Sequence, residues 1–413
     1  MTDLSAILKK IELTPVPHVK KVALAFSGGL DSSLCVELLR RVYKAQEIVA
    51  ITVNVGQGTA EMEEVIVKAH ALHITPLIID AQHEFLGHWL PKAIKANGSY
   101  NGYPVATSMT RQLIARIVAQ EAKKQGCDAL MEGSTGKGND QYRMHNVFTL
   151  FAPQLSILVP VRDFNLTRQE EQELCKAWNI PVTEQITGGD DKTIWCRSIA
   201  SGAIGLNQQI PHDVWLWLIP PLHAQDKAEE IELSFKEGVP YALNGKEMDL
   251  NTLIEKLNSI GGTHGIGLID IFEDGIMGLK SREIYEAPAA HIILKVHHDL
   301  ELLCLSKEEI QFKKNVDTSW AYLVYHGMWY HPLKKALDAF IKETQPVVNG
   351  TYKLLLYKGT ITIIERSSAS SLFFPEIRSI TSTKFDQRWC TSAAKIMGLP
   401  FEMLSQRHSK GDQ

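Results

Sequence analysis

The sequence predicts an α/β protein with a parallel-sheet N-terminal domain, an α+β second domain and a C-terminal arm. From Lys21 onward, short β-branched runs alternate with helical patterns, as in consecutive βαβ units. After about residue 180, apolar residues alternate with polar ones, which indicates antiparallel strands with one exposed face. We therefore expect domain boundaries at 1–180, 181–378 and 379–413.

Five short apolar runs in the first domain are typical of buried parallel strands. They cover residues 22–26, 48–53, 76–80, 129–132 and 157–161. Between them, residues 30–43, 61–72 and 110–125 have apolar side chains at helical spacing. Strands and helices in this order predict a sheet with helices on both faces.

The second domain shows hairpin and capping signals. Apolar residues alternate through 231–235 and lead to the turn Glu237-Gly238, and residues 352–365 form a similar pattern around Lys358-Gly359. Asp249 is expected to cap a helix over 250–260 that Gly261 ends.

Two further segments are less regular. The apolar stretch 214–222 contains paired prolines, so we expect a packed connector there and not a helix. The tail after Ser379 is either an arm that packs on another subunit or an ordinary surface helix.

Composition favours a protein that acts on small molecules. The 413 residues are 45% hydrophobic, and 43 basic against 47 acidic side chains give a net charge of −4, with no basic footprint for nucleic acid. The six cysteines are scattered, with no Cys-x-x-Cys pair, which argues against a disulfide framework or a zinc site. Without a signal peptide pattern or a membrane-length apolar run, a cytoplasmic location is expected.

A phosphate-binding loop follows the first predicted strand. The strand runs directly into Ser27-Gly28-Gly29-Leu30-Asp31-Ser32-Ser33, after which the helical pattern begins. Glycines permit close approach of the backbone to an anion, and amides at the helix start together with serine hydroxyls donate to it. Asp31 would repel phosphate unless it held Mg²⁺ against it. Neither a Walker A motif nor a dinucleotide fingerprint occurs here.

A second glycine-rich cluster follows the predicted strand at 129–132. Residues 132–143 contain three glycines, Lys137 and several hydrogen-bonding side chains, which suits an anionic ligand, although a solvated loop is the alternative. Because the carboxyl ends of parallel strands meet at one edge of a sheet, we expect the two loops to face each other.

The motif Ser-Gly-Gly-x-Asp-Ser resembles the loop of the ATP pyrophosphatase superfamily, which cleaves ATP between the α and β phosphates. Further motifs are similar to the argininosuccinate synthase family over about residues 20–370. They are Tyr103 with Thr107-Ser108 and Arg111, the run Thr135 to Gln141 with Arg143, and the blocks 264–267, 269–271, 278–282 and 284–288.

The resemblance implies a set of site residues. ATP would be held by Ala25, Phe26, Ser27, Gly28, Gly29, Leu30, Asp31, Ser32, Ser33, Val53 and Gly133, with Mg²⁺ on Asp31. Aspartate would be bound by Thr135, Asn139 and Asp140, and citrulline by Tyr103, Ser108, Asn139, Arg143, Ser198, Glu273 and Tyr285. Asp31, Lys137 and Asp140 are the expected catalytic residues.

The implied reaction has two steps. The ureido oxygen of citrulline attacks the α-phosphorus to give citrullyl-AMP and pyrophosphate, and the aspartate amine then displaces AMP. No covalent enzyme intermediate is required, so positioning and charge neutralisation must supply most of the rate enhancement. The resemblance also implies a homotetramer.

Four positions near the predicted citrulline site depart from the family pattern. Gly189 stands where a serine is usual, Ala200 and His145 replace glutamates, and Gln112 replaces a proline. Lost hydrogen-bonding groups change specificity as well as affinity.

Two alternatives to this reaction therefore remain. The first is a paralogous ligase that uses a different ureido or carboxyl acceptor, and the second is a catalytically silent ATP-binding protein. Transfer RNA thiolation would want a paired cysteine and a basic surface, neither of which the sequence shows, and glutamine-dependent amidation would need an ammonia-generating domain for which there is no room.

Overall fold

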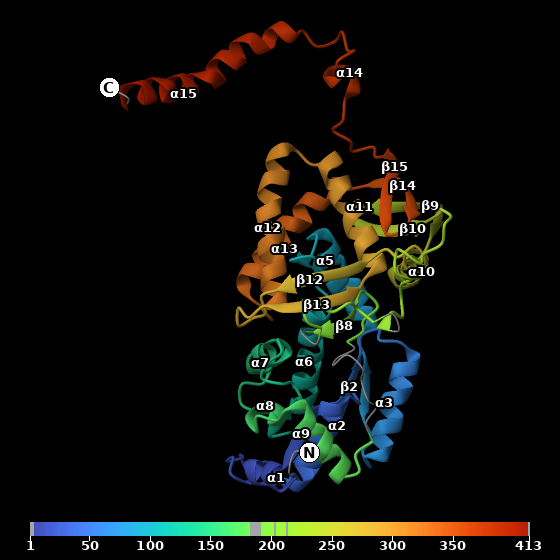
Figure 1. Ribbon diagram of the computed structural model, residues 1–413, viewed down its shortest axis with the longest axis vertical. Helices are drawn as coiled ribbons and strands as arrows, with labels where there is room; N and C mark the ends of the chain where they lie inside the picture. Colours follow the sequence, from blue (N-terminus) through green and yellow to red (C-terminus); the bar gives the residue numbers. More distant parts are fainter. Residues whose placement is uncertain (1–3, 182–190, 202–203, 212–213, 412–413) are drawn as a thin grey trace. The chain divides into compact units, whose positions relative to one another are not determined.

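The computed structural model describes residues 4–181, 191–201, 204–211 and 214–411. The chain divides into two compact units, Met1–Ser370 and Ser371–Gln413, which are described separately. Figure 1 shows the helices and strands of both units.

The first unit begins with a five-stranded parallel sheet. Its strands are β1 (Lys21–Ala25), β2 (Glu47–Asn54), β3 (Leu77–Asp80), β6 (Ala129–Met131) and β7 (Ser156–Leu158), in the order β3-β2-β1-β6-β7. The register pairs Leu24 with Ala50 on one side and with Met131 on the other. All five predicted strands are confirmed as elements. The last was predicted too long, because Pro160, which favours the first turn of a helix, opens α8 (Pro160–Asp163).

Helices cover both faces of this sheet, which explains why its strands are apolar on both sides. Val22 and Leu24 belong to a core formed with α2 (Leu30–Arg41), α3 (Thr59–Ala71) and α9 (Arg168–Ala177), whereas Ala23 belongs to a core formed with α6 (Thr107–Lys124). The N-terminal helix α1 (Leu4–Glu12) packs on α9. The chain passes from one side of β1 to the other between β2 and β6, and ligands bind at such a switch point in open α/β sheets.

Short elements connect β3 to the long helix α6. They are α4 (Gln82–Glu84), the π-helix η1 (Phe85–Trp89), α5 (Leu90–Lys95), β4 (Ser99–Tyr100) and β5 (Tyr103–Pro104). After β6, α7 (Asp140–Phe151) packs along α6. The predicted helices at 30–43, 61–72 and 110–125 are thus confirmed, with ends displaced by at most three residues.

The rest of the unit combines two antiparallel sheets with four α-helices and a short 3-10 helix. One sheet has the order β11-β10-β9-β14-β15 and the other β12-β13-β8. Their strands are β8 (Arg197–Ser201), β9 (Glu229–Lys236), β10 (Val239–Leu243), β11 (Lys246–Glu247), β12 (Leu268–Glu273), β13 (Ser281–Glu286), β14 (Gly350–Tyr357) and β15 (Thr360–Ser367). The helices are α10 (Leu250–Thr263), α11 (Pro288–Cys304), α12 (Lys307–Tyr325), α13 (Pro332–Thr344) and the 3-10 helix η3 (Gln345–Val347). Both predicted hairpins are confirmed.

The predicted end of α10 at Gly261 is wrong. Asp249 does cap the helix, accepting from the Thr252 amide at 3.0 Å, but the helix continues through Gly261 and Gly262 to Thr263. A Cβ at Gly262 would lie 1.9 Å from the Trp217 carbonyl oxygen. The glycine therefore permits close packing inside the helix. A sequence pattern does not distinguish a glycine with this role from one that ends a helix.

The apolar stretch 214–222 is a connector, as predicted, but it is only partly packed: Val214 and Leu218 are buried, whereas Leu216, Ile219 and Leu222 are exposed. The Glu286 carboxylate accepts from the backbone amides of Leu216, Trp217 and Leu218 at 2.8–3.0 Å and is paired with the Arg197 guanidinium at 2.5 Å. This buried carboxylate satisfies amides that neither a helix nor a strand would satisfy.

The second unit contains α14 (Pro375–Arg378), the 3-10 helix η4 (Gln387–Trp389) and α15 (Cys390–Gly411), with Pro400 inside α15. It has large exposed apolar side chains, including Phe373, Trp389, Met397 and Phe401. Across the described part of the chain, no helix is long and apolar enough to cross a membrane.

Candidate active site

The phosphate loop has the conformation that its sequence predicts. Gly28 has φ +72°, a region that favours glycine, and a Cβ there would lie 3.2 Å from the Val65 Cα atom on α3. The Ser32 hydroxyl accepts from the Ser27 amide at 3.3 Å and donates to the Gly29 carbonyl at 3.2 Å, which closes the loop. The amides at the start of α2 are thereby held at the carboxyl edge of the sheet, an arrangement suited to an anion.

The flanking ATP-site residues are parts of the sheet. Ala25 ends β1, and the Phe26 amide donates to the Ile51 carbonyl at 2.9 Å. Val53 is buried near the end of β2, beside the phosphate loop in the sheet order. The side chains of Phe26 and Val53 are buried in the core.

The two glycine-rich loops meet, as predicted. A Cβ on Gly133 would lie 2.9 Å from the Asp31 Cβ atom and 3.1 Å from the Ser32 amide nitrogen. Only glycine allows this approach without displacing the phosphate loop. Thr135 and Lys137 lie farther along the same loop, where Lys137 is exposed. The loop between β6 and α7 therefore forms the second wall of the phosphate site.

Asp31 is held by an arginine that the sequence did not suggest. The Arg168 guanidinium, at the start of α9, contacts the Asp31 carboxylate at 2.5 Å and the Glu171 carboxylate at 3.3 Å. Glu171 is almost fully buried, and burial together with its hydrogen bond to Asp31 raises its pKa to about 9. Burial therefore favours the neutral form of Glu171 beside the Arg168–Asp31 pair.

Two buried polar atoms in these loops have no hydrogen-bond partner, namely Ser33 Oγ and Glu132 Oε1. Glu132 Oε2 accepts from the Ser134 amide at 2.7 Å, and burial raises the pKa of Glu132 to about 7. Unpartnered buried polar atoms are uncommon and call for an explanation, and a bound ligand is one.

Asp140 lies between two arginines at the start of α7. Its carboxylate accepts from Arg111 Nε at 2.7 Å and from Arg143 Nη1 at 2.9 Å. Burial by itself raises the pKa of Asp140, but the charges of Arg111 and Arg143 outweigh it and lower the pKa below the usual value. Arg111 also pairs with Asp191. Asp140 is therefore an anion at all physiological pH values, fixed by two cations.

The predicted citrulline residues form a second cluster, built from both halves of the unit. The rings of Tyr103 and Tyr285 stack with centroids 4.6 Å apart. Glu273 accepts from the Tyr285 hydroxyl at 2.7 Å and from the Tyr325 hydroxyl at 2.5 Å, and burial raises the pKa of Glu273. Asn139 Nδ2 donates to the Tyr325 hydroxyl at 3.0 Å. The cluster is tightly packed and polar.

Three other predicted residues lie around this cluster. Arg143 Nε donates to the Tyr325 carbonyl at 3.0 Å, and its guanidinium stacks on the Tyr325 ring at 4.9 Å. Ser108 is fully buried near the start of α6 and its Oγ atom has no partner. Ser198 is half-buried on β8, where it is paired with Tyr285 of β13.

The departures from the family pattern differ in consequence. His145 is exposed on α7, so it leaves the buried cluster unchanged. Gln112 is fully buried and bonded at three points, to Ser108, Val324 and Trp329. Gly189 and the side chain of Ala200 lie outside the described residues.

Sequence reasoning missed Arg168, Glu171 and Tyr325. Arg168 and Glu171 belong to an ordinary capped, charged helix pattern, and Tyr325 ends an amphipathic helix. No local motif distinguishes them, because only the packing of distant segments brings them to Asp31 and Glu273.

The described residues include no group of three or more His, Cys, Asp or Glu side chains that could hold a metal ion. Asp31 can supply one carboxylate ligand. A single carboxylate ligand suits Mg²⁺, which keeps several of its water ligands and is commonly bound through one or two carboxylates together with substrate phosphates.

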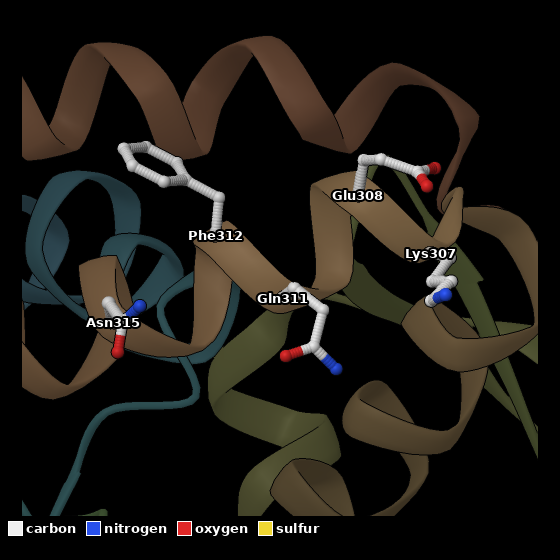
Figure 2. Close-up of a pocket in the computed structure, with 5 residues that line it drawn as sticks. All are labelled: Lys307, Glu308, Gln311, Phe312 and Asn315. Carbon is white, nitrogen blue, oxygen red and sulfur yellow. The ribbon is translucent and has the colours of Figure 1, made fainter. Parts of the chain in front are cut away.

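A shallow depression of about 450 Å³ lies elsewhere, on the outer face of α12. Figure 2 shows Phe312 pointing toward the neighbouring helix, with Gln311 and Asn315 turned away from it. The ring of Phe312 meets that of Phe340 on α13 at 5.0 Å. Lys307 and Glu308 complete the lining, and no predicted site residue takes part.

Comparison with known proteins covers nearly the whole chain. Residues 21–181 match the family model described as the arginosuccinate synthase N-terminal HUP domain, and residues 189–404 match its C-terminal domain. An argininosuccinate synthase of Methanocaldococcus jannaschii is 42% identical over 391 residues, 94% of this chain and 98% of the relative. Those of Methanopyrus kandleri and Pyrococcus furiosus are 39% and 41% identical, each over 94% of this chain and 100% and 96% of the relatives.

Proposed function

This chain belongs to the argininosuccinate synthase family, and on that premise we propose which of its residues serve each step of the reaction. It is an ATP-dependent carbon–nitrogen ligase that joins citrulline to aspartate and releases AMP and pyrophosphate, a step of arginine biosynthesis. One observation carries the assignment of residues. Two glycine-rich loops meet at the switch point of a parallel sheet, and each has a buried polar atom without a partner, Ser33 Oγ in one and Glu132 Oε1 in the other.

The triphosphate is bound by the loop 27–33. The amides at the start of α2 donate to the phosphates, and Ser33 Oγ gains in the ligand the partner that it lacks in the protein. Gly133 closes the site from the opposite loop, and exposed Lys137 is free to reach the departing pyrophosphate. Ala25, Phe26 and Val53 form the wall beside the adenosine.

Asp31 is the proposed ligand of Mg²⁺. When bound, the ion supplies charge neutralisation on the phosphates. Asp31 contacts Arg168, so it would have to release the guanidinium to hold the ion. The charge of Arg168 would then be available to neutralise a phosphate.

The two acceptor substrates lie on either side of Asn139. Aspartate is bound by Thr135, Asn139 and Asp140, whose carboxylate recognises the substrate amine. Citrulline is bound by Tyr103, Ser108, Asn139, Arg143, Ser198, Glu273 and Tyr285. The Oγ atom of Ser108 has no protein partner, and Glu273 remains able to accept further hydrogen bonds, as a polar substrate requires.

In the first step, the ureido oxygen of citrulline bonds to the α-phosphorus, and the bond from that phosphorus to the β-phosphate oxygen breaks with release of pyrophosphate. In the second, the aspartate nitrogen bonds to the ureido carbon, AMP leaves with the electrons of the carbon–oxygen bond, and the nitrogen loses a proton. Asp140 orients the amine, and the loops fix the α-phosphorus in line with the ureido oxygen.

The decisive experiment incubates the purified protein with ATP, Mg²⁺, citrulline and aspartate and measures the nucleotide product. We expect AMP, pyrophosphate and argininosuccinate in equal amounts. Formation of ADP, or faster turnover with a citrulline analogue than with citrulline, would contradict the assignment.

We also propose a cytoplasmic homotetramer in which the arm after residue 378 packs on other subunits. The apolar side chains of Phe373, Trp389, Met397 and Phe401 are exposed in a unit that has no core of its own, which favours burial in an interface. Removal of residues 371–413 is expected to lower the number of subunits per particle, obtained from light scattering as the particle mass divided by the mass of the truncated chain. A tetramer of unchanged stability after truncation would contradict this role.

A further inference from the structure

We propose that Tyr325 is a positioning residue of the acceptor site, and that Gln112 holds it there. Tyr325 ends α12 in the second half of the unit, whereas Asn139 lies in the loop before α7 in the first half. The inference rests on the proposed function, because it concerns the residues assigned above to citrulline and aspartate.

The Tyr325 hydroxyl joins the two sides of the site. It donates to Glu273 Oε2 at 2.5 Å and accepts from Asn139 Nδ2 at 3.0 Å. Both bonds use the same oxygen, so the positions of the Asn139 amide and the Glu273 carboxylate are set relative to each other. Asn139 Oδ1 in turn accepts from the Ile276 amide at 2.8 Å, which fixes the orientation of the amide.

The rest of Tyr325 is equally restrained. The ring is fully buried and stacks on Tyr100 with centroids 3.9 Å apart, and the Arg143 guanidinium lies over it at 4.9 Å. Its carbonyl accepts from Arg143 Nε at 3.0 Å. Tyr325 therefore orients three residues of the acceptor site, namely Asn139, Arg143 and Glu273.

Gln112 ties the end of α12 to α6. Its Nε2 donates to the Ser108 carbonyl at 2.7 Å and the Val324 carbonyl at 3.0 Å, and its Oε1 accepts from the Trp329 amide at 2.7 Å. The side chain is fully buried, and the Val324 carbonyl also accepts from the Gly327 amide at 3.2 Å, so Gln112 adds a second hydrogen bond at the end of α12. Ser108 and the residue before Tyr325 are thus held by a single amide group.

The turn beyond Tyr325 is docked just as closely on α7. Gly327 has φ +77°, and a Cβ there would lie 2.9 Å from the Arg143 Cα atom. The geometry of the acceptor site is consequently set by contacts between the two halves of the unit, with Tyr325 and Gln112 at the contact.

The test uses Tyr325→Phe in the full-length protein, which removes the hydroxyl and keeps the stacked ring. Loss of the hydroxyl that bridges the Glu273 carboxylate and the Asn139 amide should raise the KM for citrulline about ten- to a hundredfold and leave the KM for ATP within about twofold. Tyr322→Phe is the matched control, because Tyr322 lies one turn earlier on α12 and is half-exposed. It should match the wild type.

Gln112→Glu provides an independent test. The substitution keeps the shape and the acceptor for the Trp329 amide but removes the donors to Ser108 and Val324, and it should produce the same selective rise in the citrulline KM. Gln120→Glu, an exposed position on the same helix, is its control.

The outcomes separate this inference from the proposed function. If the wild type makes argininosuccinate but Tyr325→Phe and Gln112→Glu behave like their controls, or raise the KM values for ATP and citrulline equally, the inference is wrong and the function stands. If the wild type makes no argininosuccinate, the proposed function fails. Thermal unfolding of each variant establishes that it is folded; should Tyr325→Phe be unfolded, the Gln112→Glu result decides.

Discussion

Replacement of Asp140 by asparagine should separate the two steps of the reaction. Asp140 accepts charge-assisted hydrogen bonds from Arg111 at 2.7 Å and from Arg143 at 2.9 Å. Asparagine has the same shape but one accepting oxygen and no charge, so one guanidinium would face an amide NH₂ group. Bonds of this kind contribute about 1.5–3 kcal/mol each. Because a quarter of the Asp140 side chain is exposed, we expect a loss of about 2–3 kcal/mol of unfolding free energy in all.

The effect on catalysis should be confined to aspartate. If the Asp140 carboxylate binds the substrate amine, its loss should lower kcat/KM for aspartate about a hundredfold, the equivalent of roughly 3 kcal/mol. A single-turnover experiment with ATP and citrulline, without aspartate, should still release pyrophosphate. The assays are steady-state rates with varied aspartate and a rapid-quench measurement of pyrophosphate.

The matched control is Asp270→Asn. Asp270 also accepts two bonds from one arginine, Arg282, at 2.6 and 2.9 Å, but on β12 and outside the proposed site. It should lose little stability, because the pair is exposed to solvent, and keep wild-type kinetics. The reasoning is refuted if Asp140→Asn retains its KM for aspartate, or if it loses the aspartate-independent pyrophosphate release.

Three other variants test separate parts of the site. Asp31→Ala should abolish pyrophosphate release. The protein should stay folded, because the contact of Asp31 with half-exposed Arg168 adds little stability. Appreciable pyrophosphate release would exclude the metal role of Asp31. Arg143→Ala should raise the KM for citrulline much more than that for ATP, and equal losses would remove Arg143 from the citrulline site. Glu132→Gln should change the pH dependence of unfolding. Burial raises the pKa of Glu132 from 4.5 to about 7, so the unfolding free energy of the wild type should fall by about 3 kcal/mol as pH rises through that interval. The variant should not show this fall. Parallel curves for the two proteins between pH 4.5 and 8 would contradict that shift.

Prediction from sequence succeeded where the signal was local. The strand, the glycine turn and the start of α2 are contiguous, and the conformation of Gly28 is required by the turn itself. The meeting of Gly133 with Asp31 also followed, because parallel strands place their carboxyl ends at one edge. The Asp249 cap was predictable for the same reason, whereas the end of α10 was not, since Gly261 and Gly262 serve contacts with distant segments.

The sequence by itself determined the order of elements, the phosphate loop and the family whose chemistry those motifs carry. Tertiary structure alone decided the partners of the charged groups: Arg168 on Asp31, Arg111 and Arg143 on Asp140, and Tyr325 between Asn139 and Glu273. The physical reason is that a motif fixes the backbone over a few residues, whereas a buried charge or hydroxyl takes its partner from whichever segment packs against it. Those segments are separated by 29 residues for Arg111 and Asp140 and by 186 for Asn139 and Tyr325.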